Sequence, residues 1–308
     1  MSLAFLYAGQ GSQHPGMGAD LYEAYPEFKA VLDGADVDFD LKTVSFSDPD
    51  GVLNQTQYTQ PCMVAFAVGM TAILAGLGIT PDYAAGLSLG EYSALQAAGV
   101  FTPQQAISLA AFRGKAMADA AAGMSCGMTA VLGLDREKLQ QACDQAADAG
   151  VVEIANYNCP GQLVIGGQKE AVDKAAALAK ELGAKRCLPL KVSGPFHTSL
   201  LAPAGNALRE KFQEITFGTP RFPVLFNCLG REMGPEDTIP ALLEKQVQSS
   251  VYMEDTIRRL EELGVDTIVE IGPGKALSGF VKKTAPSIKT YAVETCADID
   301  ALAAALKG

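Results

Sequence analysis

The sequence contains few of the residues from which metal sites and disulfide frameworks are built. Its 308 residues include only two histidines, and its seven cysteines are an odd number, widely spaced and never in a C-x-x-C pair. This scatter suggests neither a disulfide framework nor a zinc ribbon and favours a reducing cytoplasm. Two distant histidines cannot be assembled into a metal cluster by spacing, so we expect no metal site.

The sequence also lacks a recognisable secretory leader. None of its apolar runs is expected to reach the length of a membrane span. The N-terminus "MSLAFLYAGQG" has no basic residue before its short apolar run and no small-residue cleavage site. This pattern is typical of a buried first strand rather than of a signal peptide. We therefore expect neither a leader nor contact with a membrane.

Positive charge is scarce, and the formal net charge is -11. An acidic balance argues against general binding to nucleic acid or to an anionic membrane. Residues 167–191 are the exception, with six bases against three acids. The six are Lys169, Lys174, Lys180, Lys185, Arg186 and Lys191. This segment is either an ordinary solvated face or a docking face for an acidic partner.

The order of apolar patterns predicts an α/β fold with an insertion. Strand and helix patterns alternate at both ends of the chain, which implies a mainly parallel sheet with helices on both faces. Residues 127–193 instead follow the order β-α-β-β-α-β, the plan of a small ferredoxin-like unit. We thus predict a large domain from residues 1–126 and 194–308, with residues 127–193 inserted as a small subdomain.

Local signals predict where several elements begin. The run "LAFLYA" (3–8) predicts the first strand, and an amphipathic helix is expected from about Asp20 to Leu32. Gln60-Pro61 is expected to open an apolar helix whose nearly all-round hydrophobicity implies burial. Thr102 and Gln105 have the spacing of a capping box at the start of another helix.

The stretch "GLSLGEY" (86–92) places Ser88 between two glycines. A Gly-x-Ser-x-Gly run can form a sharp strand-to-helix turn that exposes the serine hydroxyl and leaves backbone N–H groups beside it. The bare pattern is weak because glycine and serine are common. Its place between a short apolar run and a helix-like segment makes Ser88 a candidate nucleophile.

A catalytic serine needs a base, and the chain offers only His14 and His197. His14 lies in a polar Gly/Pro loop, where a solvent-exposed side chain is the simpler interpretation. His197 lies in the Gly-Pro turn "VSGPFHTSL", where the inserted segment returns to the large domain, and such loops commonly line a cleft. His197 is the candidate base, with a structural role as the alternative.

Seven short blocks occur in order along nearly the whole chain. They are "GQGSQ" (9–13), "TQP" (59–61), "GLSLGEYSAL" (86–95), "FRGKAM" (112–117), "NYNCPGQLVIGG" (156–167), "VSGPFH" (192–197) and "EIGPGKAL" (270–277). This series resembles the malonyl-CoA:acyl carrier protein transacylase family of bacterial fatty acid synthesis. The resemblance implies an α/β-hydrolase-like core with a ferredoxin-like insertion, and a cytoplasmic, usually monomeric enzyme without a cofactor.

The resemblance also implies the reaction and its central groups. A malonyl group would pass from malonyl-CoA to Ser88, and then to the phosphopantetheine thiol of acyl carrier protein. His197 would be the base, oriented by a backbone carbonyl near Gln246 in place of the carboxylate of a Ser-His-Asp triad. The backbone N–H groups of Gln10 and Leu89 would form the oxyanion hole.

Further roles in recognition follow from the same resemblance. Arg113 would bind the free malonyl carboxylate, although a helix cation alone more often compensates the helix dipole or lies at the surface. Gln60 would contact the substrate, and Phe196 would crowd an α-methyl branch. The basic segment 167–191 would dock the acidic carrier.

One position departs from the family pattern, because Leu87 precedes the serine where relatives often have histidine. The alternative functions are a serine thioesterase or hydrolase of α/β type and a noncatalytic scaffold. No acid occupies an evident triad position for the hydrolase.

Overall fold

The computed structural model describes residues 1–307, which group into two compact units. Unit 1 comprises Met1–Gly114, Phe217–Phe226 and Arg258–Gly308, and unit 2 comprises Lys115–Thr216 and Asn227–Ile257. These limits differ from those of the predicted domains, 1–126 with 194–308 and 127–193. The units group residues by contact, whereas the predicted domains follow the order of elements, so the predicted limits stay a prediction.

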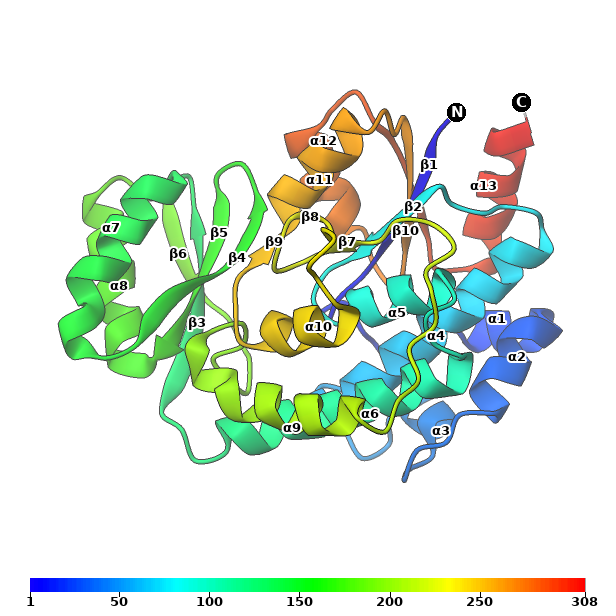
Figure 1. Cartoon of the computed structure of the whole chain (residues 1–308), viewed down its shortest axis with the longest axis horizontal. Helices are drawn as coiled ribbons and strands as arrows, with labels where there is room; N and C mark the ends of the chain where they lie inside the picture. Colours follow the sequence, from blue (N-terminus) through cyan, green and yellow to red (C-terminus); the bar gives the residue numbers. More distant parts are fainter. Residues whose placement is uncertain (308) are drawn as a thin grey trace. The chain divides into compact units, whose positions relative to one another are not determined.

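A four-stranded parallel sheet forms the centre of unit 1 (Figure 1). Its order is β11 (Lys289–Val293), β10 (Thr267–Ile271), β1 (Leu3–Tyr7) and β2 (Tyr83–Gly86). β1 and β10 are buried at every position, as expected for a parallel sheet that is covered on both faces. Val224, just before β7 (Leu225–Phe226), continues the parallel pairing at Ala84. The predicted mainly parallel core is confirmed.

Nine helices belong wholly or partly to unit 1 in residues 1–307. They are α1 (Ala19–Ala24), α2 (Pro26–Asp33), α3 (Leu41–Phe46), α4 (Thr56–Gly76), α5 (Gly90–Ala97), α6 (Pro103–Ala121), α11 (Met253–Glu262), α12 (Ala276–Thr284) and α13 (Cys296–Lys307). The helix predicted from Asp20 to Leu32 is two helices. Tyr25 is extended between them, because a residue before proline is forced out of the helical region.

Helix α4 begins at Thr56, so the prediction that Gln60-Pro61 opens it was wrong by more than one turn. Pro61 lies inside the helix, where its missing N–H removes only one hydrogen bond of the ladder. The 21-residue helix also has the length and hydropathy of a membrane span, contrary to the expectation that no run is long enough. Its apolar side chains already have protein partners, since 78% of the relevant window is buried.

The start of α6 has the predicted capping box. The Thr102 N–H donates to Gln105 Oε1 at 2.9 Å, and the Gln105 N–H donates to Thr102 Oγ1 at 3.2 Å. Two helix N-terminal donors are thereby satisfied by side chains three residues apart.

Unit 2 contains a five-stranded sheet in the order β6-β3-β5-β4-β9. Its elements are β3 (Cys126–Leu132), α7 (Arg136–Ala146), β4 (Val152–Cys159), β5 (Gln162–Gln168), α8 (Lys169–Glu181), β6 (Arg186–Pro189) and β9 (Val251–Tyr252). The pairs β3–β5, β3–β6 and β4–β5 are antiparallel, and β9 pairs parallel with β4. The order β6-β3-β5-β4, with α7 after β3 and α8 after β5, confirms the ferredoxin-like plan. The other elements are the short helices Ala147–Ala149 and Ser199–Leu201, α9 (Ala202–Phe212), β8 (Arg231–Glu232) and α10 (Ile239–Val247).

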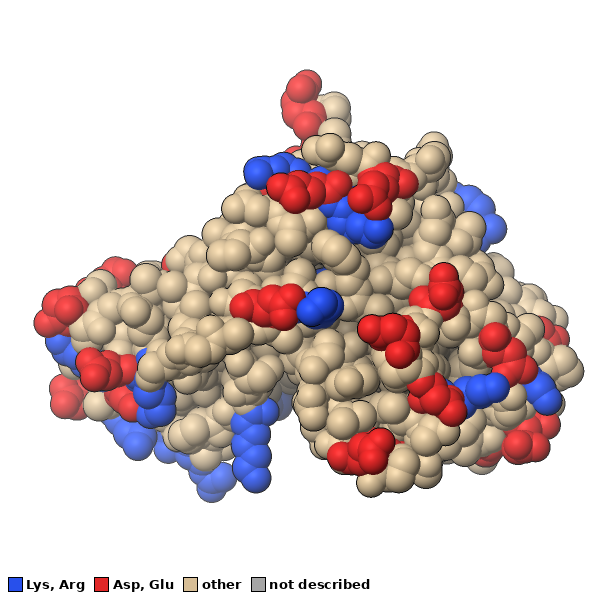
Figure 2. Space-filling view, turned by 90° about the horizontal axis from the view of Figure 1, so that it is seen from below, with Lys and Arg blue, Asp and Glu red and all other residues tan. Residues whose placement is uncertain are grey.

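The bases of the segment 167–191 fall into two groups. Lys169 is ion-paired with Asp173, and Lys174 with Asp148. The other four, Lys180, Lys185, Arg186 and Lys191, form no ion pair within residues 1–307. Figure 2 shows basic side chains gathered at the lower left edge of the view.

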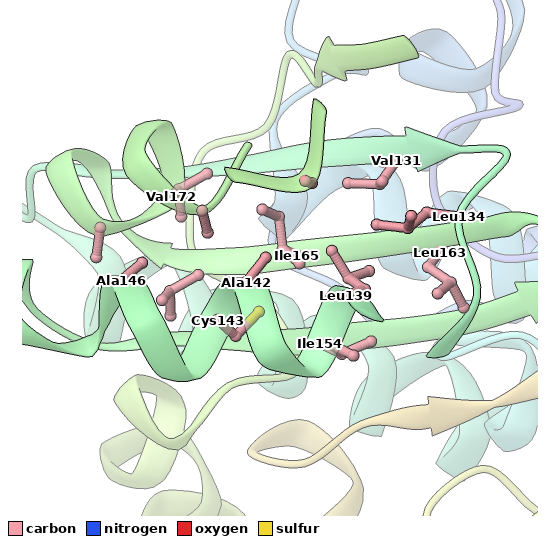
Figure 3. Packing of buried hydrophobic residues seen from close by; sticks show 14 residues of the cluster. Val131, Leu134, Leu139, Ala142, Cys143, Ala146, Ile154, Leu163, Ile165 and Val172 are labelled. Carbon is pink, nitrogen blue, oxygen red and sulfur yellow. The ribbon is translucent and has the colours of Figure 1, made fainter. Parts of the chain in front are cut away.

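The core of the ferredoxin-like elements is made by amphipathic helices on one face of the sheet (Figure 3). On α7, Leu139, Ala142, Cys143 and Ala146 are buried at a helical spacing of three and four residues. They share one buried cluster with residues of β3, β4 and β5, among them Val131, Ile154 and Ile165.

Candidate active site

Ser88 lies in a left-handed backbone conformation at the turn between β2 and α5. Only three non-glycine residues in the described part of the chain have positive φ: Asp48, Ser88 at 53° and His197 at 59°. Such conformations are costly for non-glycine residues and cluster at functional sites. Two of the three are the residues that the sequence nominated as nucleophile and base.

The glycines around Ser88 are required by close packing. A Cβ atom on Gly86 would lie 2.1 Å from the carbonyl carbon of Gly90, and one on Gly90 would lie 2.3 Å from the Tyr7 carbonyl oxygen. A Cβ atom on Gly9 would lie 2.6 Å from the Leu87 carbonyl oxygen. Backbone therefore packs directly on backbone where β1, the loop after β1 and the serine turn meet.

Arg113 contacts both Ser88 and Gln60. Its side chain is completely buried, with Nη1 donating to Gln60 Oε1 at 2.8 Å and Nη2 donating to Ser88 Oγ at 3.1 Å. The next residue, Gly114, lets α6 approach α4, because a Cβ there would lie 2.7 Å from the Thr56 carbonyl oxygen. Complete burial excludes the interpretation of Arg113 as a surface cation.

Two neighbours of Ser88 on α5 shape the electrostatics of Arg113. Burial lowers the pKa of the Arg113 guanidinium, whereas the nearby Tyr92 and Glu91 oppose that shift. The Arg113 Cζ lies 5.5 Å from the centre of the Tyr92 ring. Burial likewise raises the pKa of Tyr92 above its ordinary value. Neither residue was assigned a role from the sequence, although both follow Ser88 closely, in the first turn of α5.

The two groups nominated for an oxyanion hole are backbone donors in unit 1. In residues 1–307, neither the Gln10 N–H nor the Leu89 N–H donates a hydrogen bond to another protein group. Leu89 is the N-cap residue of α5, at the positive end of the helix dipole. The Gln10 side chain is held by α4, since its Nε2 donates to Thr56 Oγ1 at 3.1 Å.

His197, in unit 2, is hydrogen-bonded to the end of α10. Its Nδ1 lies 2.9 Å from the Gln246 carbonyl oxygen, the contact that the resemblance implied. A carbonyl can only accept, so Nδ1 carries the proton and Nε2 is the basic nitrogen of the neutral ring. Gln246 lies in the last turn of α10, where carbonyls lack partners within the helix and the dipole is negative.

The turn that carries His197 is packed tightly within unit 2. Thr198 Oγ1 donates to the Pro195 carbonyl at 2.6 Å, and both Phe196 and His197 are buried. A Cβ on Gly194 would lie 2.7 Å from the Phe196 ring. The structure thus brings Ser88, Gln60 and Arg113 together in unit 1, and holds Phe196, His197 and Gln246 within unit 2.

No group of three or more histidine, cysteine, aspartate or glutamate side chains within residues 1–307 is arranged to hold a metal ion. The chemically active groups are instead one hydroxyl and one buried guanidinium in unit 1, and one imidazole in unit 2.

Comparison with known proteins gives matches along nearly the whole chain. The family model of the acyl transferase domain matches residues 4–300. A malonyl CoA-acyl carrier protein transacylase of Bacillus subtilis is 42% identical over 294 residues, which are 94% of this chain and 93% of the relative. A crystal structure of a malonyl CoA-acyl carrier protein transacylase from Clostridium perfringens has a TM-score of 0.97 at 38% identity, covering 100% of this chain and 98% of that one. A malonyl-transacylase solved in complex with a type II PKS acyl-carrier protein has a TM-score of 0.95 at 37% identity, covering 99% of this chain and 100% of that one.

Proposed function

Because this chain belongs to the acyl transferase domain family, and within it to the malonyl-CoA:acyl carrier protein transacylases, we propose that Ser88, His197 and Arg113 carry out its reaction. The chain is an acyltransferase that moves the malonyl group from malonyl-CoA to the thiol of acyl carrier protein. The roles of these residues rest on the geometry within each unit.

In the first half-reaction, Ser88 Oγ attacks the thioester carbonyl carbon while His197 Nε2 takes the hydroxyl proton. The oxyanion accepts hydrogen bonds from the N–H groups of Gln10 and Leu89. The C–S bond then breaks, His197 returns its proton to the sulfur of coenzyme A, and a malonyl-serine ester remains. In the second half-reaction the carrier thiol gives its proton to His197 and attacks the ester, and Ser88 leaves and regains a proton.

The observation that carries the malonyl assignment is the 3.1 Å contact between Arg113 Nη2 and Ser88 Oγ. In a malonyl-serine ester the free carboxylate carbon is three bonds from Oγ, so a guanidinium at this distance is within reach of that carboxylate. The other terminal nitrogen of the Arg113 guanidinium, Nη1, donates to Gln60 Oε1 at 2.8 Å, and this hydrogen bond fixes its orientation. A guanidinium held in this way suits a short acid with a terminal carboxylate, which it can bind with two parallel hydrogen bonds.

Intact-mass spectrometry tests the function directly. After mixing with malonyl-CoA, the protein is expected to gain one malonyl group and to lose it when carrier protein with its phosphopantetheine arm is added. Steady release of free malonate without any carrier would instead identify the alternative, a serine thioesterase or hydrolase. The relatives favour the transacylase over that alternative.

Replacement of Arg113 by alanine is expected to lower kcat/KM for malonyl-CoA by about 30-fold to 4,000-fold, because truncating one partner of a buried charge pair costs about 2–5 kcal/mol. Acetyl-CoA has no carboxylate to lose, so its kcat/KM should fall much less. The measurement is the ratio of kcat/KM for the two thioesters. Arg113→Lys keeps the charge but not the planar fork, and should give an intermediate ratio.

Lys115→Ala is the matched control for Arg113, since Lys115 lies two residues later on α6 and is exposed and ion-paired with Asp119. Its ratio should equal that of the wild type. An unchanged ratio in Arg113→Ala would contradict the role in substrate selection.

We place the docking of the carrier on the segment 167–191 and the residues just after it. Arg186, like Lys180, Lys185 and Lys191, forms no ion pair within residues 1–307, so these bases remain available to an acidic partner. Large apolar side chains are exposed beside them, with Leu188 at 45%, Leu190 at 39% and Val192 at 38%. Exposed apolar residues rimmed by charge are characteristic of protein interfaces.

Reversal of Lys185 and Arg186 to glutamate is expected to raise KM for the carrier by about tenfold and to make it less sensitive to salt, since charges at an interface rim steer association. Acylation by malonyl-CoA alone should not change. Lys169→Glu is the control, because Asp173 already neutralises that lysine. An unchanged KM for the carrier in the double reversal would refute this docking face.

The cellular compartment and the oligomeric state of the enzyme are also part of the proposal. The structure has no disulfide among the seven cysteines, which supports a reducing cytoplasm. A monomer without a cofactor remains the expectation from the family.

A further inference from the structure

The loop that carries the Gln10 N–H is hydrogen-bonded to two other parts of unit 1, residues 54–56 and Glu294. Within the loop, residues 9–18, the Gln10 and Gln13 side chains bond to Thr56 and Asn54, at 3.1 and 2.8 Å. The remaining side-chain anchor is His14, whose Nε2 lies 2.5 Å from Glu294 Oε1. Among these three anchors only His14 is titratable near neutral pH.

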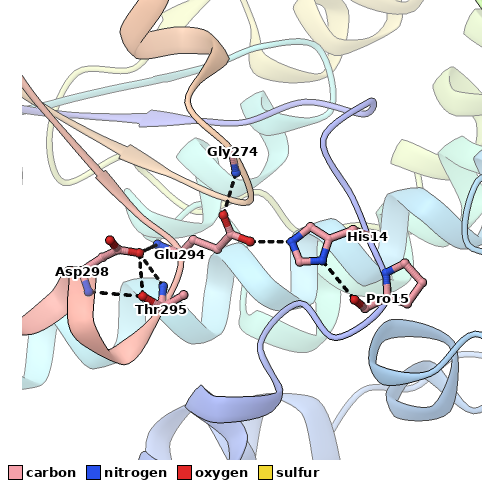
Figure 4. Close-up of polar contacts among 6 residues, drawn as sticks. All are labelled: His14, Pro15, Gly274, Glu294, Thr295 and Asp298. Atoms are coloured by element: carbon pink, nitrogen blue, oxygen red, sulfur yellow. Dashed lines mark hydrogen bonds and ion pairs between the residues drawn. The ribbon is translucent and has the colours of Figure 1, made fainter.

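His14 faces an acceptor at each ring nitrogen (Figure 4). Nδ1 lies 3.0 Å from the Pro15 carbonyl oxygen, and Nε2 lies against the Glu294 carboxylate. A neutral imidazole has one N–H and can satisfy only one of them, whereas the imidazolium donates to both. The Glu294 hydrogen bond, followed by the Pro15 carbonyl, raises the pKa of His14 from its ordinary value. The structure therefore favours the protonated ring.

Glu294 ties three segments together through one carboxylate. Its second oxygen accepts the Gly274 N–H at 2.9 Å, which belongs to the "EIGPGKAL" block after β10. That block also packs on the chain that leads into the loop: a Cβ on Gly272 would lie 2.5 Å from Ala8 Cβ. This block is one of the seven found in the sequence, where it carried no assigned role. Its glycines allow the close approach that aligns the carboxylate with His14.

The other charged groups near this cluster do not take the place of the His14–Glu294 pair. Asp298 on α13 accepts the N–H of Glu294 at 3.1 Å, and Asp20 accepts the N–H of Cys296 at 2.8 Å. Lys275, before α12, acts electrostatically on Asp298. Glu294 is the acid that acts on the His14 ring, both through its hydrogen bond and through its charge.

We propose that protonated His14 is a positioning residue, which through Glu294 holds loop 9–18 so that the Gln10 N–H faces the developing oxyanion. The inference rests on the proposed role of Gln10. His197 must be neutral to act as a base, whereas His14 must be charged to hold the loop. As the pH rises through the raised pKa of His14, one of its two hydrogen bonds is lost, and the acylation rate falls. The contribution of the pair to the free energy of unfolding has the same sign, because it is complete below the ordinary histidine pKa and is lost at high pH.

Single-turnover acylation by malonyl-CoA, followed by intact mass between about pH 6 and pH 9, tests the proposal across the range in which a histidine with a raised pKa titrates. The wild-type rate constant should decline at the alkaline end. In His14→Gln it should be reduced about three- to tenfold, less than the loss from removing an oxyanion donor outright, and should show no alkaline decline. Glu294→Gln should shift the decline to lower pH. The apparent Kd for malonyl-CoA should change little in either variant.

Two measurements that do not depend on activity separate this inference from the proposed function. The His14 ring resonance in NMR, assigned by its absence in His14→Gln, should titrate at lower pH in Glu294→Gln. Amide exchange at Gln10 should quicken in both variants, which tests the loop even if the wild type forms no malonyl adduct. Lys42→Gln, which removes an exposed ion pair with Asp33 outside the loop, is the control and should change none of these quantities. Wild-type rates, pH profile and Gln10 exchange in both variants would overturn the proposal.

Discussion

Replacement of Ser88 by alanine is expected to abolish the malonyl adduct and to lower transfer to the carrier by at least about 10⁴-fold, given that loss of the nucleophile costs about 10⁶-fold in serine proteases. The hydroxyl forms the covalent intermediate, so neither the base nor the oxyanion donors can compensate for its loss. The measurement combines intact mass after mixing with malonyl-CoA and the rate at which the carrier becomes loaded.

The alanine variant should keep the fold, because it retains the Cβ and removes only the oxygen that accepts a hydrogen bond from Arg113. Ser93→Ala is a matched control, since Ser93 is a buried serine on the same helix, α5. It should form the adduct at the wild-type rate. A malonyl group that persists on the Ser88→Ala protein would disprove the assignment of the nucleophile.

Replacement of His197 by alanine is expected to slow acylation by about 10³- to 10⁶-fold, because a serine hydroxyl is a weak nucleophile without an adjacent base. The acid limb of the wild-type pH profile, which reports protonation of the base, should disappear with it. Single-turnover acylation as a function of pH measures both effects.

The orienting group gives this second prediction a sharp control. His197 is held by the backbone carbonyl of Gln246 and not by a side chain. Gln246→Ala keeps that carbonyl and should therefore retain far more activity than His197→Ala, whatever it does to stability. Equal losses in the two variants would contradict orientation by the carbonyl. An aspartate or glutamate does the orienting in a Ser-His-Asp triad, and here the negative end of α10 takes its place.

The fold could be predicted wherever the pattern was local. Alternating strands and helices indicated the parallel sheet, and the order of elements in residues 127–193 indicated the ferredoxin-like plan. Errors arose where one residue altered an otherwise uniform pattern. Pro26 divides the helix predicted from Asp20 to Leu32, and Pro61 was taken as a helix start although the ladder tolerates it inside α4.

The candidate site was predictable through Ser88 and Arg113, because each stands in a short distinctive block. His14 was interpreted as a simple exposed histidine, and its ring is indeed half exposed. Its partner, Glu294, is 280 residues away in the sequence, and no spacing rule connects them. Tyr92 and Glu91 were missed for another reason. Both residues stand in the block that contains Ser88, but their closeness to Arg113 depends on how α5 and α6 pack.

The positive φ angles of Ser88 and His197 have a consequence for anyone who would make this enzyme more heat-resistant. Glycine, or in part asparagine, would relax both backbones, so a library screened only for thermal tolerance is drawn toward replacements that cannot catalyse. Such screens should score turnover at every round, since at these two positions durability and turnover select for opposite residues.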